Sequence, residues 1–491
     1  MEREKTQERE AAAALAKALG NLPLALEQAA AYATQARLSL AEYLELFRAR
    51  EPEVAARLTG AEEYPTALAT VFDITFARVR TESPAAADLL TLCAFLAPDE
   101  VPLEILKDSA EHLPPALAEA SADPEKLAAS AAVLQNYALA KVRGGSFLTL
   151  HHFIQAAARD RLGEDDRKNW AGATVQLMEA AFPFDYTNPQ TWPPSARLLP
   201  HALAAAEHAR ELKVLEKATS SLLNQAGLYL QTKAELVKAK VTFEQALETV
   251  TPKFGAEHSL VSTLLNNLGN VLYDMGDFDG ARASYERALA IAETVYGLDH
   301  LEVAIRLNNL GVILQDMGDF DGARVNFERA LVIAESHYGS DHQQVAIYLN
   351  NLGELLKRQG DLEGARERLE RALAIDEAAP VLNPTSIATR LNNLGSVLRR
   401  IGDLNSALTN FERALAMDEV TYGPNHPTVA LRLNNVGTIL DAQGDLSGAR
   451  ANYERALGIF REVLGEDHPL TLLVKRNLAG LGGKGEGEGE S

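Results

Sequence analysis

The amino-acid sequence predicts a mostly all-α protein whose larger part is a solenoid of stacked helix pairs. The first observation behind this prediction is a block, Asn-Asn-Leu-Gly at 266–269, that returns every 42 residues, with Asn-Asn-Val-Gly at 434–437 as its last copy. The second is that Gly-Asp and Glu-Arg-Ala-Leu recur at the same step. A fixed period of this length is typical of repeat architectures, in which each unit packs mainly against its neighbours.

Each repeat unit contains two helical patterns. In the segment 263–275 the leucines and valines fall on one side at a 3.6-residue period, and Ala281, Tyr285 and Ala288 do the same in the next segment. Gly276-Asp277 separates the two, as a helix end and turn should. One such pair cannot bury its own apolar face, so neighbouring pairs must stack. About five good repeats, one weaker unit and a final helix give a predicted solenoid at 216–480.

The repeat resembles a known family. Its pattern N-L-G, G-D and A-x-x-x-[YF]-x-x-A-L resembles the tetratricopeptide repeat, and the long period with a closing Tyr-Gly-x-x-His resembles the variant of kinesin light chains. The resemblance implies a right-handed α-solenoid that holds proteins or peptides in a concave groove. The segment DEAAPVLNPTS at 376–386 lacks both the Tyr-Gly and the Asp-His, so we expect an irregular path there.

A polar stripe follows the first helix of each repeat, on the side opposite the leucines. Its recurring member is the second asparagine of the block, and a row of amides suits the backbone of an extended peptide. Tetratricopeptide grooves use similar positions, so the resemblance implies that peptide backbone is held by Asn267, Asn309, Asn351, Asn393 and Asn435. An alternative stays open, in which one asparagine of each pair bonds the neighbouring helix and fixes the repeat register.

Four basic residues lie in or just beside the stripe in two consecutive repeats: Arg358 and Arg400 in it, and Lys357 and Arg399 beside it. They stand out in a chain with a formal net charge of −21. The resemblance implies that they attract carboxylates of a partner, whereas the alternative is a solvated face. Earlier repeats carry Asp274 and Asp316, so we expect the groove to change from acidic to basic along its length.

Histidines recur just before the first helix of successive repeats, at His258, His300, His342, His426 and His468. Successive copies should be about 10 Å apart, the distance between packed helices. One metal ion cannot bridge that distance, so we predict a structural role and no metal site.

The first two hundred residues lack the repeat and resemble another family. GNLPLALEQAAAY at 20–32 resembles the GLPLAL motif of NB-ARC modules in STAND signalling NTPases. FDITFARVRTES at 72–83 and FLTLHHFIQAAARDRL at 147–162 resemble the winged-helix domain that follows NB-ARC. The resemblance implies a helical segment at 1–60, a winged-helix-like domain at 61–165 and a helical connector at 166–215. It also implies that Pro23 contacts adenine and His151 a phosphate of ADP.

The sequence lacks one motif that nucleotide binding by this family requires. A P-loop of the form G-x-x-x-x-G-K-[ST] cradles phosphates, and the sequence contains none. The Gly-rich end, 481–491, predicts a flexible acidic tail instead. We therefore expect Pro23 and His151 to contact ADP or ATP only if a nucleotide-binding core is supplied. Otherwise they are a helix-turn proline and a packing histidine.

Composition narrows the possible partners and the location. The acidic charge disfavours nucleic acid and anionic lipid, and Arg159 and Arg161 are few cations for a DNA-reading helix. No run approaches the roughly 20 apolar residues that span a bilayer. The single cysteine, Cys93, lies in the apolar run LLTLCAFLA, which predicts a core residue and fits a reducing, cytoplasmic location.

These observations together favour a non-enzymatic interaction scaffold that binds an extended peptide or partner surface, with acidic residues as a feature of the ligand. No nucleophile, acid–base pair or metal constellation occurs at workable spacing, so we predict no catalytic residues and no cofactor. The alternative is the sensor half of a STAND NTPase whose P-loop core is missing from this chain. The two hypotheses differ in whether nucleotide binds.

Overall fold

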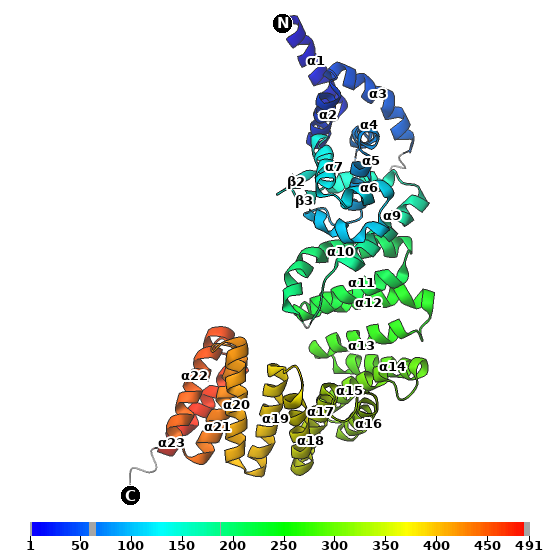
Figure 1. The fold of residues 1–491 in the computed structure, drawn as a ribbon. Coiled ribbons are helices and arrows are strands. Elements are labelled where there is room, and N and C mark those ends of the chain that lie inside the picture. The colour runs from blue at the N-terminus through cyan, green and yellow to red at the C-terminus, as the bar shows by residue number, and fades with distance from the viewer. Residues whose placement is uncertain (1, 58–64, 187, 486–491) are drawn as a thin grey trace. The chain divides into compact units, whose positions relative to one another are not determined.

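The computed structural model describes residues 2–57, 65–186 and 188–485, with side chains for 7–57, 65–107, 110–186 and 188–481. Within these residues the chain forms 23 α-helices, two short 3₁₀ helices and one small sheet, which confirms the predicted, mostly helical repeat fold (Figure 1). The chain divides into two compact units, Met1–Met275 and Gly276–Ser491.

The N-terminal unit begins with a helical region and a small sheet. Its helices as far as the sheet hairpin are α1 (Glu2–Ala18), α2 (Pro23–Ala36), α3 (Leu40–Arg57), α4 (Thr66–Glu82), α5 (Pro84–Cys93), η1 (Leu103–His112), α6 (Pro115–Ser121) and α7 (Pro124–Asn136). The strands β1 (Val101–Pro102), β2 (Lys141–Arg143) and β3 (Phe147–Thr149) form an antiparallel sheet in the order β1-β3-β2. The hairpin between β2 and β3 turns at two glycines with positive φ, Gly144 and Gly145.

The rest of this unit is helical. It comprises α8 (His152–Asp160), α9 (Glu164–Ala181), η2 (Pro189–Thr191), α10 (Trp192–Leu212), α11 (Glu216–Thr232), α12 (Leu236–Phe254) and α13 (Ser259–Asp274). Cys93 is fully buried at the end of α5, as predicted, and burial raises the pKa of its thiol to about 12. A buried, protonated thiol is a packing group rather than a nucleophile.

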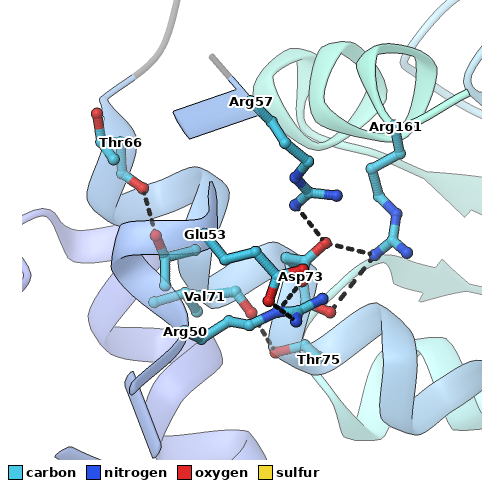
Figure 2. A network of polar contacts seen from close by, with 9 residues as sticks. Arg50, Glu53, Arg57, Thr66, Val71, Asp73, Thr75 and Arg161 are labelled. Atoms are coloured by element: carbon cyan, nitrogen blue, oxygen red, sulfur yellow. Dashed lines mark hydrogen bonds and ion pairs between the residues drawn. The ribbon is translucent and has the colours of Figure 1, made fainter. Parts of the chain in front are cut away.

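A buried ion cluster fastens α3 to α4 and α8 (Figure 2). The carboxylate of Asp73, only 2% exposed, accepts hydrogen bonds from Arg50 Nε at 2.7 Å and Arg57 Nη2 at 2.8 Å. Arg161, which follows α8 as its C-cap, adds an ion pair at 3.0 Å and stacks over the Phe76 ring. Burial opposes ionisation of Asp73, but the bonds from Arg57 and Arg50 outweigh it and lower the pKa of this carboxyl group.

The C-terminal unit is a run of consecutive helix pairs, coloured green to red in Figure 1. Its helices are α14 (Phe278–Tyr296), α15 (Leu301–Asp316), α16 (Phe320–Tyr338), α17 (Gln343–Gln359), α18 (Leu362–Ala378), α19 (Pro384–Ile401), α20 (Leu404–Tyr422), α21 (Pro427–Gln443), α22 (Leu446–Leu464) and α23 (Pro469–Gly485). Helix α23 extends to Gly485, past the expected start of the acidic tail, and 486–491 lie outside the described residues.

The Gly-Asp pair and the glycine of the Asn-Asn-Leu-Gly block explain the tight pairing within each repeat. Asp319 caps α16 because its carboxylate accepts the Gly322 N–H at 2.9 Å, and Gly318 adopts φ 85°, which suits glycine. Gly353 has a different role. A Cβ at this position would lie 2.7 Å from Leu369 Cγ, so only glycine allows α17 and α18 to approach this closely.

The Tyr-Gly-x-x-His motif forms the turn between repeats. The Tyr338 ring stacks on His342 with 4.7 Å between centroids, and His342 Nδ1 accepts the Gln344 N–H at 3.2 Å. The other recurring histidines cap their helices in the same way, at His258, His300, His426 and His468. These histidines therefore have the structural role predicted for them. In the part of the chain that the structure describes, no group of three or more His, Cys, Asp or Glu could hold a metal ion.

The junction between α18 and α19 is irregular, as the sequence predicts. Helix α18 ends at Ala378, without the Tyr-Gly that ends α14, α16 and α20, and Asn383 replaces histidine as the cap by accepting the Ser386 N–H at 3.2 Å. Val381 in this turn is 78% exposed.

The arginine of Glu-Arg-Ala-Leu links one repeat to the previous one. Arg371 forms an ion pair with Glu335 at 2.7 Å and donates to the Ser340 carbonyl at 2.8 Å. Arg329 and Arg455 make equivalent pairs and carbonyl bonds, and Arg413 makes the ion pair with Glu377. These bridges explain why the motif recurs at a fixed step.

Candidate peptide-binding face

Polar and apolar side chains recur together on one side of the first helices of the C-terminal unit. We call this surface the asparagine face. Its apolar row consists of Ile305, Ile347, Thr389, Leu431 and Leu473. Its amide row consists of Asn309, Asn351, Asn393, Asn435 and Asn477. Its charged row consists of Asp316, Lys357, Arg358, Arg399 and Arg400. All of these side chains are partly or largely exposed.

The amide row forms a hydrogen-bonded ladder between successive repeats. Asn351 Nδ2 donates to Asn308 Oδ1 at 2.8 Å, and Asn350 Nδ2 donates to Asn351 Oδ1 at 3.3 Å. The same link, 43 residues long, joins Asn393 to Asn350, Asn435 to Asn392 and Asn477 to Asn434, and in the N-terminal unit Asn267 to Asn224. Both asparagines of a pair therefore fix the register, where the sequence left this role open for one of them.

The ladder does not use every hydrogen-bonding group of the asparagine side chains. An asparagine side chain has two N–H donors and two acceptor lone pairs. Among the described residues, the ladder engages one donor and one lone pair of Asn351 and of Asn393. Each of these half-exposed amides therefore keeps a donor and an acceptor for a further partner.

The basic residues predicted from the sequence do lie together, but most of them are engaged. Lys357 Nζ lies 2.5 Å from Glu354, and Arg358 lies 3.1 Å from Asp316 of the previous repeat. Arg400 donates to the backbone carbonyl of Lys357 at 2.5 Å. Arg399 is exposed, and its guanidinium makes no hydrogen bond or ion pair with the described residues. Four cations against these two carboxylates leave a local surplus of positive charge.

In the N-terminal unit, Pro23 and His151 lie at the same cavity. Its volume is about 840 Å³, and its lining includes Lys141 and Arg143 of β2. Pro23 is the first residue of α2, and His151 caps α8 because its Nδ1 accepts the Phe153 N–H at 3.2 Å. The fold thus brings together two residues that are 128 positions apart in the sequence.

The chemistry of His151 follows from its capping bond. Because Nδ1 accepts, the neutral ring carries its proton on Nε2 and can donate it. Burial lowers the pKa of His151, and the charges of His152 and Lys141 act in the same direction. The lining of this cavity holds two cations, Lys141 and Arg143, and two carboxylates, Glu27 and Asp99, and the cations lie on β2.

The two arginines of α8 and its C-terminal turn have structural partners. Arg159 donates to the backbone carbonyl of Ala94, and Arg161 belongs to the Asp73 cluster. Neither side chain is presented as an isolated cation for phosphate contacts.

The comparisons with known proteins establish the class of the chain. The segments 218–294, 260–335, 302–378, 386–461 and 433–481 match the tetratricopeptide repeat model and together cover just over half of the chain. The chain therefore belongs to the tetratricopeptide repeat family, whose repeats serve as protein–protein interaction scaffolds. Residues 77–167 match a domain of unknown function, DUF7779. No curated protein matches the chain.

Three solved structures are among those to which parts of the chain are similar. BtubC (BKLC) from P. vanneervenii is 21% identical with a TM-score of 0.39, over 53% of this chain and 93% of its own. A putative kinesin light chain from Podosopora anserina, with nearly identical TPR-like repeats, is 20% identical with a TM-score of 0.37, over 42% of this chain and 98% of its own. YrrB, a TPR protein with an unusual peptide-binding site, is 20% identical with a TM-score of 0.30, over 47% of this chain and 98% of its own.

Hydropathy adds a finding about membranes. Within the described residues, no helix combines the length and the apolar character needed to cross a bilayer.

Proposed function

We propose that the chain is a non-enzymatic scaffold whose asparagine face forms a groove for an extended peptide or partner segment. The observation that carries this proposal is that the ladder leaves hydrogen-bond donors and acceptors of its amides unused. At successive repeats, a rigidly held amide keeps one donor and one acceptor. Extended backbone offers alternating carbonyl and N–H groups that match them. A reducing cytoplasm fits the buried, unpaired Cys93.

The charged row adds a preference for acidic partners. Arg399 is an exposed cation that makes no ion pair or hydrogen bond with the described residues, and Lys357, Arg358 and Arg400 add further positive charge to the row. In a chain of net charge −21, such a local surplus attracts carboxylates and repels basic segments.

A peptide selection tests the proposal. The full-length chain is panned against displayed random peptides of about 15 residues, which can cross five repeats at ~3.3 Å per residue. Peptides rich in Asp and Glu are expected to be enriched. Arg399→Glu should lower the affinity of the enriched peptides about tenfold, equivalent to ~1.4 kcal/mol.

The matched control is Arg366→Glu, which makes the same charge change on α18, where Arg366 pairs with Glu370. This variant should bind as the parent does. Equal loss in both variants would show a general charge effect, and absence of any enriched peptide would contradict the proposed function.

A second candidate, binding of ADP or ATP as the sensor part of a STAND-type NTPase, is favoured by the shared cavity of Pro23 and His151. Its volume is within the ~300–1,000 Å³ of ordinary ligand sites. Lys141 and the Nε2 proton of His151 would hold phosphate, and Pro23 would face the base. When bound, ADP would supply a charged link between α2 and α8. The hairpin between α7 and α8 supports a winged-helix-like interpretation of this region.

Titration of the full-length chain with a fluorescent ADP analogue tests this candidate. Saturable binding that Lys141→Glu weakens at least tenfold would support it, with Lys240→Glu on α12 as the matched control. An unchanged signal at all ADP concentrations would exclude nucleotide binding by this chain on its own.

A further inference from the structure

The apolar side chains of the asparagine face are exposed at a regular interval, one in each of most repeats. Ile305, Ile347 and Leu473 are 40%, 42% and 38% exposed, although each lies in a helix with a buried apolar side. Each lies four residues before a ladder asparagine, which is one helical turn away on the same face. Leu431 continues the row, and Thr389 interrupts it in the middle. The face therefore presents an apolar group beside an amide at most repeats.

The ladder fixes the distance between successive members of the row. Side-chain amides of adjacent repeats lie within 2.8–3.0 Å of each other, and Cα atoms of α17 and α19 approach within 8 Å. Packed helices at such contacts have axes about 8–10 Å apart. A chain that follows the face covers about one repeat with three residues, at ~3.3 Å per residue in a strand or ~3.1 Å in polyproline II.

The two conformations differ in how often a side chain returns to the same side of the backbone. In a β-strand, side chains alternate, so residues three apart point to opposite sides. In polyproline II, every third side chain returns to the same side. Because the face repeats an amide at each step and an apolar group at most steps, a polyproline II segment can present a side chain to every step and a strand only to alternate ones. Its backbone also makes no internal hydrogen bonds, so its carbonyls can accept from the ladder amides.

We propose that the partner is a polyproline II segment of about 13 residues with apolar side chains three residues apart and acidic side chains near its centre. This inference rests on the proposed function. Counted from Ile305, the apolar contacts fall at steps 0, 3, 9 and 12, and step 6 faces Thr389 on α19, the helix whose last turn carries Arg399 and Arg400. Charge complementarity places the acidic residues there, since the helices of steps 0 and 9 carry Asp316 and Asp441 instead of arginines at the corresponding positions.

The spacing of the selected peptides is the decisive measurement. The peptides enriched on the full-length chain are expected to carry apolar residues at a three-residue period around an acidic centre. A synthetic copy of one such peptide should bind at least tenfold more weakly when a single residue is inserted between two of its apolar positions. The insertion keeps every original residue of the peptide but breaks the period.

Two variants locate the contact. Ile347→Glu should weaken that peptide at least tenfold, and Val332→Glu should not, because Val332 is 64% exposed on the second helix α16. Both are surface changes that leave the core intact. Enriched peptides with a two-residue apolar period would overturn the polyproline II inference while leaving peptide binding in place. No enrichment at all would overturn both.

Discussion

Glycine has two roles in the repeats that composition alone does not separate. Gly437 belongs to the Asn-Asn-Val-Gly block of α21, and a Cβ there would lie 2.8 Å from Tyr453 Cε1. Gly458 lies in the middle of α22, and a Cβ there would meet no atom within 4 Å. The first glycine permits a close helix contact, whereas the second only weakens its own helix.

Alanine at these two positions should therefore have opposite effects. Gly437→Ala is expected to lower the free energy of unfolding by about 1–3 kcal/mol through overpacking. Gly458→Ala should raise it by about 0.5–1 kcal/mol through helix propensity. Urea denaturation of the two variants measures both, and a change of the same sign in both would contradict the assignment.

His201 on α10 makes the N-terminal unit sensitive to acid. It is 2% exposed, and burial lowers its pKa, although hydrogen bonds that the ring donates to the backbone of Glu100 and Ala97 oppose the shift. A histidine with a lowered folded-state pKa binds fewer protons than the unfolded chain. Stability is therefore full above the unfolded pKa of about 6.5 and falls as the pH drops below it.

The expected result is a lower melting temperature of the parent at pH 5.5 than at pH 7.5, with a smaller difference in His201→Gln. The variant should be less stable at the higher pH, since a buried ring is lost. Circular dichroism melts at both pH values provide the measurement. An equal pH difference in parent and variant would assign the acid sensitivity to other groups.

At the scale of the element, one repeat can pack on the next through more than one kind of residue pair. Asp376 of α18 pairs with Arg390 of α19 at 2.7 Å, and both side chains are almost fully buried. Burial raises the pKa of Asp376 despite the nearby arginine. One repeat earlier, the equivalent positions hold Ala334 and Tyr348, which are also buried. An ion pair and an apolar pair thus occupy the same place in the repeat.

This equivalence predicts strong coupling in a double-mutant cycle. Asp376→Ala alone should cost about 3–5 kcal/mol, because it leaves a buried guanidinium without a partner. Adding Arg390→Tyr, which copies the previous repeat, should restore most of that loss. Unfolding of the two single variants and the double variant measures the coupling. Additive losses would show that the two positions do not form one exchangeable unit.

The helix pairs could be predicted from the sequence because their determinants are local. Apolar period, the Gly-Asp turn and the capping histidines all act within one repeat, and each has its counterpart in the structure. The chemistry of the asparagine face could be predicted only in part. The Asn351 side chain can bind a ligand or hydrogen-bond to Asn308, and which of these it does depends on a contact between residues 43 positions apart. The salt links of Lys357 and Arg358 likewise depend on how neighbouring turns meet.

At the scale of the whole molecule, the links described for the C-terminal unit join adjacent repeats. The asparagine ladder, the Arg371-type bridges and the Tyr-His turns all follow this rule. Removal of residues 321–362, which is one period, should therefore leave a folded protein with an unchanged helix content per residue. Removal of 321–350 should not, because it joins non-equivalent positions. Circular dichroism and denaturant midpoints of the two deletions provide the test.

The 43-residue step of the ladder also constrains how such a gene can change in length. One residue inserted into a first helix turns the following asparagine by about 100° and takes its amide out of reach of the previous repeat. A whole period inserted at the same place gives the amide an equivalent partner. Viable length variants of this protein should therefore differ by multiples of one repeat, and its size should change in discrete steps.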